Sequence, residues 1–296
     1  MNGTHRLKTT VLFFIILLLG ISGCTGFKSN LVVDSSKLAS ANITKAANEN
    51  SDFAMVRDGM PGGLLQMDGF IKMAPDDKEL LLSAAESNSG YAFLFVQDED
   101  KPRAVKLFKK AKKYAFRVLK QNPAFKDACD KSKEEFAEAL KTFDKEDVPA
   151  LYLGMNSWLS YIGLANAEDP SLLMNLPKVE AMMDRILELD ETYKYGAIHA
   201  VMGTYHAAKP EIFGGKPKEA KKHFEKAFEI SKRKFLIWHL LFAKFYTVQI
   251  QDQDLFVKTL EEAIEAPENL LPEQNFANEA ARHKAKALLE KVDTLF

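Results

Sequence analysis

The feature that most constrains the fold is the spacing of the apolar residues, which recur every three or four positions from residue 64 onward. This spacing gathers apolar side chains on one face of a helix, whereas a strand would alternate at every second position. Prolines stand between the periodic segments, where helices end or begin. The sequence therefore predicts an all-α fold, with helical segments at Leu80–Val96, Val105–Leu119, Phe136–Phe143, Leu151–Leu164, Val179–Leu189, Tyr195–Tyr205, Phe224–Ile230, Phe235–Ile250, Phe256–Ile264 and Ala280–Leu295.

Four of these segments share a ridge of small and large apolar residues with the spacing x3 and x2. The ridges are Ala104/Phe108/Ala111, Val179/Met183/Ile186, Ala220/Phe224/Ala227 and Phe256/Leu260/Ala263. Such a ridge is typical of the second helix of a tetratricopeptide repeat, and Ala92 and Gly203 supply the small residue of the preceding helix. We expect a helical-repeat superhelix of about four cryptic tetratricopeptide repeats, because each unit must bury its apolar face against a neighbour.

Several segments lie outside this repeat pattern. An extra helix is expected around residues 126–145, a lengthened loop around residues 212–215, and a capping helix from Glu273 to Phe296. The glycine- and proline-rich stretch Asp58–Gly63 predicts a turn. The repeats together with these extra and capping helices would form one domain over residues 53–296.

The N-terminus has the three parts of a signal peptide over residues 1–23. Basic residues come first, and an apolar run of 11 residues from Val11 to Ile21 follows. That run is too short for a spanning helix of about 20 residues, so a transmembrane anchor is disfavoured. Ile21-Ser22-Gly23-Cys24 resembles the lipobox of bacterial lipoproteins, and lipid on Cys24 would hold the chain at a membrane.

The residues after Cys24 bear on location and reach. Thr25 stands where an aspartate would retain a lipoprotein at the inner membrane, so we expect an anchor on the periplasmic side of the outer membrane. Residues 24–52 are rich in Ser, Asn and Ala, and predict a tether that becomes helical toward the folded body.

Composition excludes some classes of partner. The net charge is −1 with 27% charged residues, which implies no general attraction to nucleic acid. Cys129 is the one cysteine besides Cys24, so no disulfide framework exists, and it is expected as a small core residue. The basic stretch Lys101–Lys113, with seven Lys or Arg, is either a solvated helix face or a dock for an acidic partner.

The register of a tetratricopeptide repeat assigns twenty residues to a concave groove, of which only Glu86 is charged. They are Glu86, Ser89, Phe93, Val96, Gln97, Asn156, Leu159, Gly163, Asn166, Ala167, Ala197, Ala200, Thr204, Ala207, Ala208, Leu236, His239, Ala243, Tyr246 and Thr247. An uncharged groove favours a small or hydrophobic ligand over an acidic peptide. The alternative is that the chain's own capping elements fill the groove.

Several side chains could have either a chemical or a structural role. His199 and His206 share one helix face and are expected mainly as core histidines, with a pocket role as the alternative. Trp158, Trp238, Tyr161 and Tyr195 are expected to pack in the core rather than to bind a ligand. No His/Cys/Asp cluster has metal-ligand spacing, so no metal or other cofactor is predicted. No nucleophile with a nearby base is recognisable, and the sequence indicates no enzyme.

A set of short motifs is spread along about residues 55–296. They are Arg57-Asp58-Gly59-Met60-Pro61, Asp169-Pro170, Val179-Glu180-Ala181, Leu187-x-Leu189-Asp190, Tyr195-Gly196-Ala197-x-His199, Gly203-x-Tyr205, Gly214-Gly215-x-Pro217, His223-Phe224-Glu225-x-Ala227 and Leu295-Phe296. In these motifs the chain resembles the T component of TRAP (tripartite ATP-independent periplasmic) transporters, which are periplasmic tetratricopeptide lipoproteins.

The resemblance implies a non-enzymatic homotrimer, with a pore or cleft in each protomer, that associates with the substrate-binding P protein. A hydrophobic small-molecule ligand is also implied. The candidate groove or pore residues are Phe93, Asn156, Trp158, Leu159, Tyr161, Asn166, His199, Thr204, Tyr205, His206, His239 and Tyr246. The rival hypothesis is a tetratricopeptide scaffold lipoprotein for envelope assembly, which binds a protein segment and no small molecule.

Overall fold

The computed structural model describes residues 24–209 and 214–296, and within these residues it contains helices and connecting turns but no strand. The all-α prediction is confirmed. The signal-peptide prediction concerns residues 1–23, which lie outside the described residues. The α-helices are α2 (Cys24–Glu49), α3 (Phe53–Met73), α4 (Lys78–Tyr91), α5 (Lys101–Leu119), α6 (Pro123–Ala128), α7 (Lys133–Leu140), α8 (Val148–Ala165), α9 (Leu176–Asp190), α10 (Tyr193–Ala207), α11 (Pro217–Ser231), α12 (Ile237–Leu241), α13 (Gln253–Glu265), α14 (Asn275–Leu289) and α15 (Val292–Leu295).

Short irregular helices complete the order. Two π-helical segments, η1 (Ala92–Val96) and η5 (Phe242–Thr247), continue α4 and α12. Among the described residues, short 3₁₀ helices precede α8, α9 and α14, and they are η2 (Lys145–Asp147), η3 (Pro170–Asn175) and η6 (Pro272–Gln274). π-helical turns often occur at functional positions in helices, which draws attention to η1 and η5.

Local sequence signals explain most helix starts. The side chains of Asp77, Asp100 and Ser132 each accept a hydrogen bond from a backbone N–H of the first turn, which is the role of an N-cap. Pro102 and Pro217 stand in first turns, where the missing N–H has no helical partner to lose. Proline placement between helices therefore marks most boundaries correctly.

The predicted turn at Asp58–Gly63 is wrong, because α3 runs through it without a break. Pro61 lies inside this helix, although proline removes one backbone hydrogen bond there. Val56, Leu64, Met67 and Ile71 are buried on one face of α3, at helical spacing. Packing of that face overrides the weak helix propensity of the glycines and the proline.

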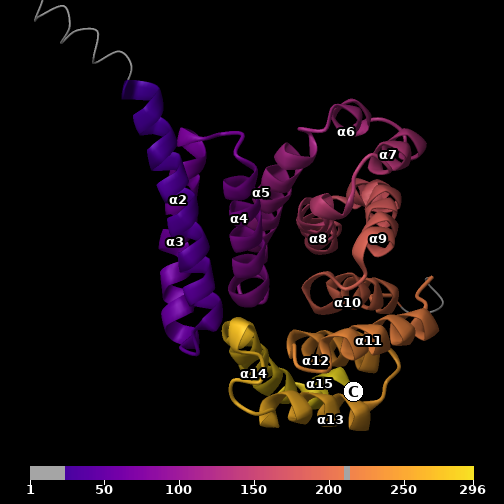
Figure 1. Ribbon diagram of the computed structural model, residues 1–296. Coiled ribbons are helices and arrows are strands. Elements are labelled where there is room, and N and C mark those ends of the chain that lie inside the picture. The colour runs from indigo at the N-terminus through magenta and orange to yellow at the C-terminus, as the bar shows by residue number, and fades with distance from the viewer. Residues whose placement is uncertain (1–23, 210–213) are drawn as a thin grey trace, which may run out of the picture.

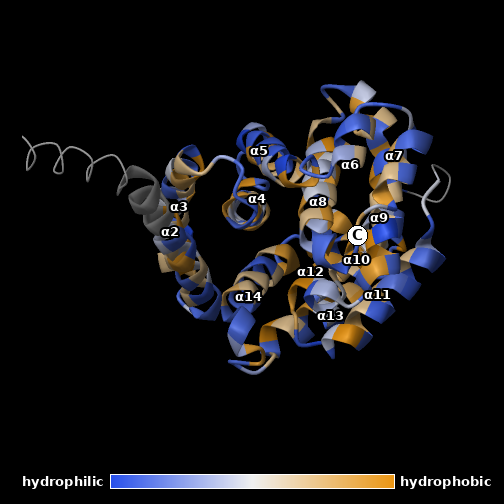
Figure 2. Cartoon of the chain, turned by 45° about the horizontal axis from the view of Figure 1, so that its top comes forward, coloured by the Kyte–Doolittle hydropathy of each residue, from blue (hydrophilic) through white to orange (hydrophobic). Residues whose placement is uncertain are grey.

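Consecutive helices pack in pairs, α4 with α5, α8 with α9, α10 with α11, and α12/η5 with α13 (Figure 1). The four ridges seen in the sequence belong to α5, α9, α11 and α13, and every ridge residue is at most 2% exposed. Apolar residues gather where the helices meet, and much of the outer surface is hydrophilic (Figure 2). These features support the repeat interpretation, which stays a prediction.

The expected extra helix near residues 126–145 corresponds to two short helices, α6 and α7. Phe125, Phe136 and Phe143 pack together there, with ring centroids 5.2 and 5.3 Å from Phe125. Cys129 follows α6 as a buried free thiol. Its surroundings belong to the largest apolar cluster, which also includes residues of α4, α5, α8 and α9.

The N-terminal helices α2 and α3 pack against the first helix pair and against α14, which follows the last pair. α2 is one continuous helix over most of the segment expected as a tether, and α2 and α3 each contact both α4 and α14. Lys37 of α2 forms an ion pair with Asp77 at 2.7 Å, and Ser36 and Ser40 are buried. The part of α2 after about residue 36 therefore belongs to the folded body.

Candidate functional site

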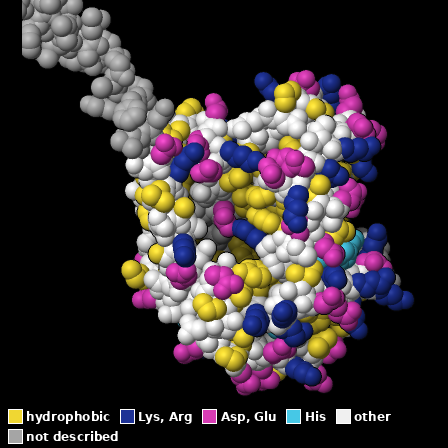
Figure 3. Space-filling model, viewed as in Figure 1, with side chains coloured by type: hydrophobic (Ala, Val, Ile, Leu, Met, Phe, Trp, Pro, Cys, Tyr) yellow, Lys and Arg dark blue, Asp and Glu magenta, His cyan; other side chains and the backbone are white. Residues whose placement is uncertain are grey.

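The inner helices of the pairs form a continuous row, because α4 contacts α8, α8 contacts α10 and α10 contacts α12. A hollow opens in this face of the molecule, with hydrophobic side chains on its floor and charged side chains at its rim (Figure 3). It lies between α4 on one side and α8 and α10 on the other (Figure 1). We take this hollow as the candidate site, and the inner helices α4, α8 and α10 border it.

Four residues from these three helices meet, and we call them the central cluster: Glu86, Tyr152, Tyr193 and Lys194. Lys194 of α10 forms an ion pair with Glu86 of α4, and the rings of Tyr152 and Tyr193 meet edge to face at 5.5 Å. Burial, followed by the negative charge of Glu86, raises the pKa of both tyrosines. Both phenols therefore stay protonated, and the cluster offers hydroxyl groups beside one balanced charge pair.

A left-handed backbone turn builds half of this cluster. Lys194, Tyr195 and Gly196 have φ values of 45°, 62° and 78° at the start of α10. Residues with side chains adopt this region rarely, and such strain often accompanies function. A Cβ on Gly196 would lie 3.1 Å from Ile230, so glycine also permits close packing on α11.

The same turn ties α10 to α12. The ring of Tyr195 stacks on Phe235 at 5.2 Å, and its carbonyl oxygen accepts a hydrogen bond from the indole N–H of Trp238 at 2.9 Å. The Tyr195 hydroxyl donates to Glu273 at 3.0 Å. One short turn therefore links α10 to α4 through Lys194 and to the fourth pair through Tyr195.

Further contacts join the first helix pair to the last pair and to α14. Phe93 of η1 packs against the apolar cluster that contains Trp238 and Phe242. Asp98, directly after η1, pairs with Lys244 of η5 at 3.3 Å and with Lys284 of α14 at 2.6 Å. The two π-helical segments, η1 and η5, therefore lie where the first and last helix pairs contact each other.

An aromatic stack reinforces this junction. Phe53 of α3 stacks on His283 of α14 at 4.3 Å and lies 5.2 Å from Phe95 of η1. Phe276 of α14 completes the group, 5.9 Å from Phe95. α3 and α14 therefore both contact η1, the segment that contains the predicted groove residue Phe93.

The predicted groove residues of α8 divide between core and helix end. Trp158 is 5% exposed and lies in the core, edge to face with Phe116 at 5.3 Å. Leu159 and Tyr161 are half-buried and pack on the same apolar cluster. Asn166 donates to the carbonyl oxygens of Ile162 and Gly163 at the helix end, and Asn156 is half-buried on α8. The structure therefore gives Trp158 and Asn166 structural contacts.

Those of α10 and η5 also have partners inside the protein. Thr204 donates back to the carbonyl oxygen of Ala200, and Tyr205 donates to Glu180 of α9 at 2.7 Å. Tyr246 is buried and stacks on Phe242 at 4.9 Å. None of these contacts joins the central cluster.

His199 and His206 lie on the side of α10 that faces α11, with His223. The Nδ1 atoms of His199 and His223 are 3.0 Å apart, and His199 Nε2 lies 3.2 Å from Glu191. If His199 donates to Glu191 through Nε2, its Nδ1 accepts from His223, so neutral rings satisfy this chain. Burial lowers the pKa of all three histidines, and His199 and His206 further lower that of His223, to about 4.

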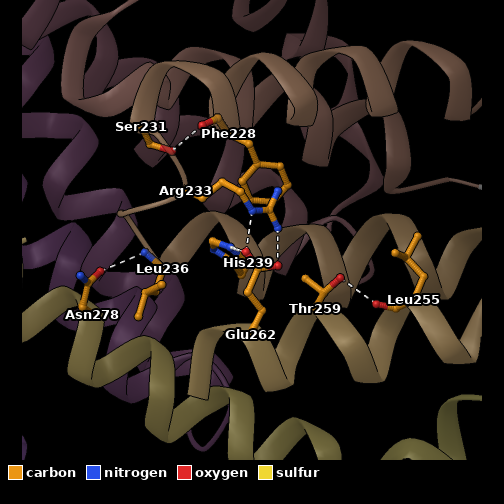
Figure 4. A network of polar contacts seen from close by, with 9 residues as sticks. All are labelled: Phe228, Ser231, Arg233, Leu236, His239, Leu255, Thr259, Glu262 and Asn278. Carbon is orange, nitrogen blue, oxygen red and sulfur yellow. Dashed lines mark hydrogen bonds and ion pairs between the residues drawn. The ribbon is translucent and has the colours of Figure 1, made fainter. Parts of the chain in front are cut away.

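His239 belongs to a separate polar network (Figure 4). Its side chain is fully buried, and Nε2 lies 3.2 Å from Glu262, which Arg233 holds through two hydrogen bonds of 2.6 Å. Burial and the charge of Arg233 lower the pKa of His239 to about 4. Neutral His239 therefore donates Nε2–H to Glu262 and links α12 to α13.

Of the central cluster, the groove predicted from the sequence includes Glu86 and lacks Tyr152, Tyr193 and Lys194. Tyr193 and Lys194 precede the expected helical register, because the left-handed turn interrupts it. The glycine of Tyr193-Lys194-Tyr195-Gly196 is the signal that could have revealed this turn. Tyr152 lies four residues before Asn156, so a groove register extended by one turn would have included it.

The described residues lack two further features. No group of three or more His, Cys, Asp or Glu residues there is arranged to hold a metal ion. None of the described helices has both the length and the apolar character needed to cross a bilayer.

Paired helices around a hollow with a hydrophobic floor define an all-α protein. A family model for the TRAP transporter T-component matches residues 49–296, and the chain belongs to that family. An uncharacterized protein of Treponema pallidum (strain Nichols) is 22% identical over 275 residues, which cover 88% of this chain and 85% of that protein. The family assigns an accessory role in TRAP transport.

Proposed function

We propose that this protein is an accessory lipoprotein of a TRAP system, which binds the substrate-binding P protein and holds a small hydrophobic ligand in its hollow. The observation that carries the proposal is the family match over residues 49–296. The hollow supports the proposal of a ligand, because its apolar floor would fit the hydrophobic body of such a molecule and the central cluster would fit a polar end.

Lipid on Cys24 would place the protein at the periplasmic side of the outer membrane, and a homotrimer would present three hollows. Metabolic labelling with a radioactive fatty acid tests the anchor, with Cys24→Ser as the comparison. The anchor is supported if the wild type is labelled and the variant is unlabelled and released from the membrane, whereas equal labelling of the two contradicts it.

Sedimentation of the protein without residues 1–24 tests the trimer, and a monomer at all concentrations contradicts that part of the proposal.

The ligand is tested by extracting purified protein with organic solvent and measuring the extract by mass spectrometry. A recurrent hydrophobic compound in near-stoichiometric amount supports the proposal. Glu86→Lys should reduce its recovery, because it turns the ion pair with Lys194 into a repulsion. The double variant Glu86→Lys/Lys194→Glu restores an ion pair and serves as the matched control.

The rival function is a scaffold for envelope assembly, which binds a protein segment alone. Its supporting observation is the set of contacts that helices of the chain itself make beside the predicted groove, at Phe53, Phe93 and Asp98. An empty extract, together with binding of a peptide that protects the hollow from exchange, would favour the scaffold over the transport accessory.

A further inference from the structure

The outer helix of the first pair has an unusual charge pattern. α5 carries eight Lys or Arg residues over Lys101–Leu119 and no Asp or Glu. α11, the outer helix of the third pair, carries four Lys and three Glu over Pro217–Ser231. A solvated surface normally mixes both signs, as α11 does. The single sign of α5 needs a separate explanation.

The lysines of α5 follow one stripe along the helix. Lys106, Lys109 and Lys113 are exposed and stand at positions i, i+3 and i+7, on the side opposite the buried ridge of Ala104 and Phe108. Among the described residues, none of these three lysines has a carboxylate within ion-pair distance. On α11, by contrast, Lys221 pairs with Glu225 at 3.8 Å and Lys222 with Glu219 at 2.9 Å, besides a third pair at Lys226.

Lys112 borders this stripe on the side of α8. Its ammonium lies 3.7 Å from the ring centroid of Trp158 and 4.9 Å from that of Phe116. Burial lowers the pKa of Lys112 to about 8, and the like charges of Lys120 and Lys109 act in the same direction. An acidic group brought against this edge would stabilise the ammonium.

The stripe weakens the helix that carries it. Lys106 and Lys110, and Lys109 and Lys113, are like charges four residues apart, a spacing at which each pair destabilises a helix by about 0.2–0.5 kcal/mol. Lys110 forms an ion pair with Asp68 of α3 at 2.5 Å, but no ion pair in the described residues requires Lys106, Lys109 or Lys113, which lie opposite the buried ridge. A positive face that opposes folding is expected where it meets a complementary negative surface.

We propose that the stripe Lys106, Lys109 and Lys113, with Lys112 at its edge, is the docking surface for an acidic face of the protein partner. This inference rests on the proposed function, which identifies that partner as the substrate-binding P protein. Lys106 and Lys113 are seven residues apart, or about 10 Å along the helix, so the partner would present carboxylates at similar spacing.

The surroundings of the stripe favour a protein over an anionic bilayer. Asp76, Asp130 and Glu168 border α5, where they pair with Arg117, Lys120 and Lys101, and their side chains remain 88%, 88% and 67% exposed. A uniformly negative lipid surface would be repelled by these carboxylates. A protein face with a matching pattern of charges accommodates both the lysines and their acidic border.

The experiment measures binding of the mature chain to the purified P protein of the same transport system by isothermal titration calorimetry. The stripe variant is Lys106→Glu/Lys109→Glu/Lys113→Glu. The control is Lys218→Glu/Lys221→Glu/Lys222→Glu on α11, which changes the net charge equally. Circular dichroism and thermal melting of both variants show whether each is folded.

We expect the stripe variant to bind at least about tenfold more weakly than wild type, and the control to bind within about twofold. Wild-type affinity should fall as NaCl is raised from about 50 to about 300 mM, and that of the stripe variant should change little. Equal binding by wild type and a folded stripe variant would overturn the docking surface and leave the proposed function standing. No binding by wild type would overturn both. Binding of the stripe to vesicles containing anionic lipid, lost in the stripe variant while P-protein binding persists, would assign it to the membrane and refute the inference.

Discussion

α5 and α11 have the same inner face and different outer faces. In each helix a ridge of Ala, Phe and Ala at the same spacing is at most 1% exposed. Outside, α5 is basic throughout, while α11 alternates Lys with Glu and forms ion pairs along its length. The comparison separates two roles of sequence. The buried ridge determines how a helix packs, and the outer charges determine what it can bind.

The largest expected effect tests the shared inner face. Phe108→Ala and Phe224→Ala should each lower the free energy of unfolding by about 3–5 kcal/mol, because each leaves a cavity in a closed core. Urea denaturation followed by circular dichroism measures both. A loss below about 1 kcal/mol in either variant would show that the two ridges are not equivalent.

A smaller effect tests how closely the α11 ridge meets the preceding helix, α10. A Cβ on Gly203 would lie 2.8 Å from the ring of Phe224, so Gly203→Ala should destabilise the protein by about 1–3 kcal/mol. Gly163 of α8 has no atom within 4 Å of such a Cβ. Gly163→Ala is therefore the matched control and should stabilise by about 0.5–1 kcal/mol. Equal effects at both positions would contradict the close approach of α10 and α11.

Acid should weaken the third pair through His223, and α5 has no counterpart. The pKa of His223 in the folded protein is lowered to about 4, so the unfolded chain binds more protons between pH 4 and 6.5. The stability contributed by neutral His223 is complete above pH 6.5 and is lost as pH falls toward 4. Denaturation at pH 7, 6 and 5 should show a shallower decline for His223→Gln than for wild type. Parallel declines would rule out this titration.

The smallest effect separates the outer faces. Lys113→Glu should raise stability by about 0.2–0.5 kcal/mol, since it removes repulsion from Lys109 and places a carboxylate four residues before Arg117. Lys221→Glu should lower it by a similar amount, because it turns the pair with Glu225 into a repulsion. Thermal melting at low salt resolves the two signs. The same sign for both variants would remove the contrast between α5 and α11.

The sequence predicted those features that depend on periodic burial. Helical spacing gave the all-α fold, and the Ala-Phe-Ala pattern located two ridges that are fully buried. Local propensity misled at Asp58–Gly63, where burial of one face of α3 outweighs its glycines and Pro61. The burial of Trp158 follows the expectation of packing, and its inclusion among groove residues came from position alone.

The site was harder to predict, because it depends on contacts between distant helices. Glu86 and Lys194 are 108 residues apart, and a left-handed turn directs Lys194 toward α4. Periodicity carries no information on such a turn. His199 and His206 share a helix face as the spacing of seven implies, but their partner His223 comes from the next helix.

The most direct test of the α5 surface is hydrogen–deuterium exchange of the mature chain alone and with saturating P protein. The account predicts that peptides covering residues 101–119 gain protection in the complex, while peptides covering 217–231 exchange as in the free protein. Protection of residues 217–231 without change at 101–119 would contradict it.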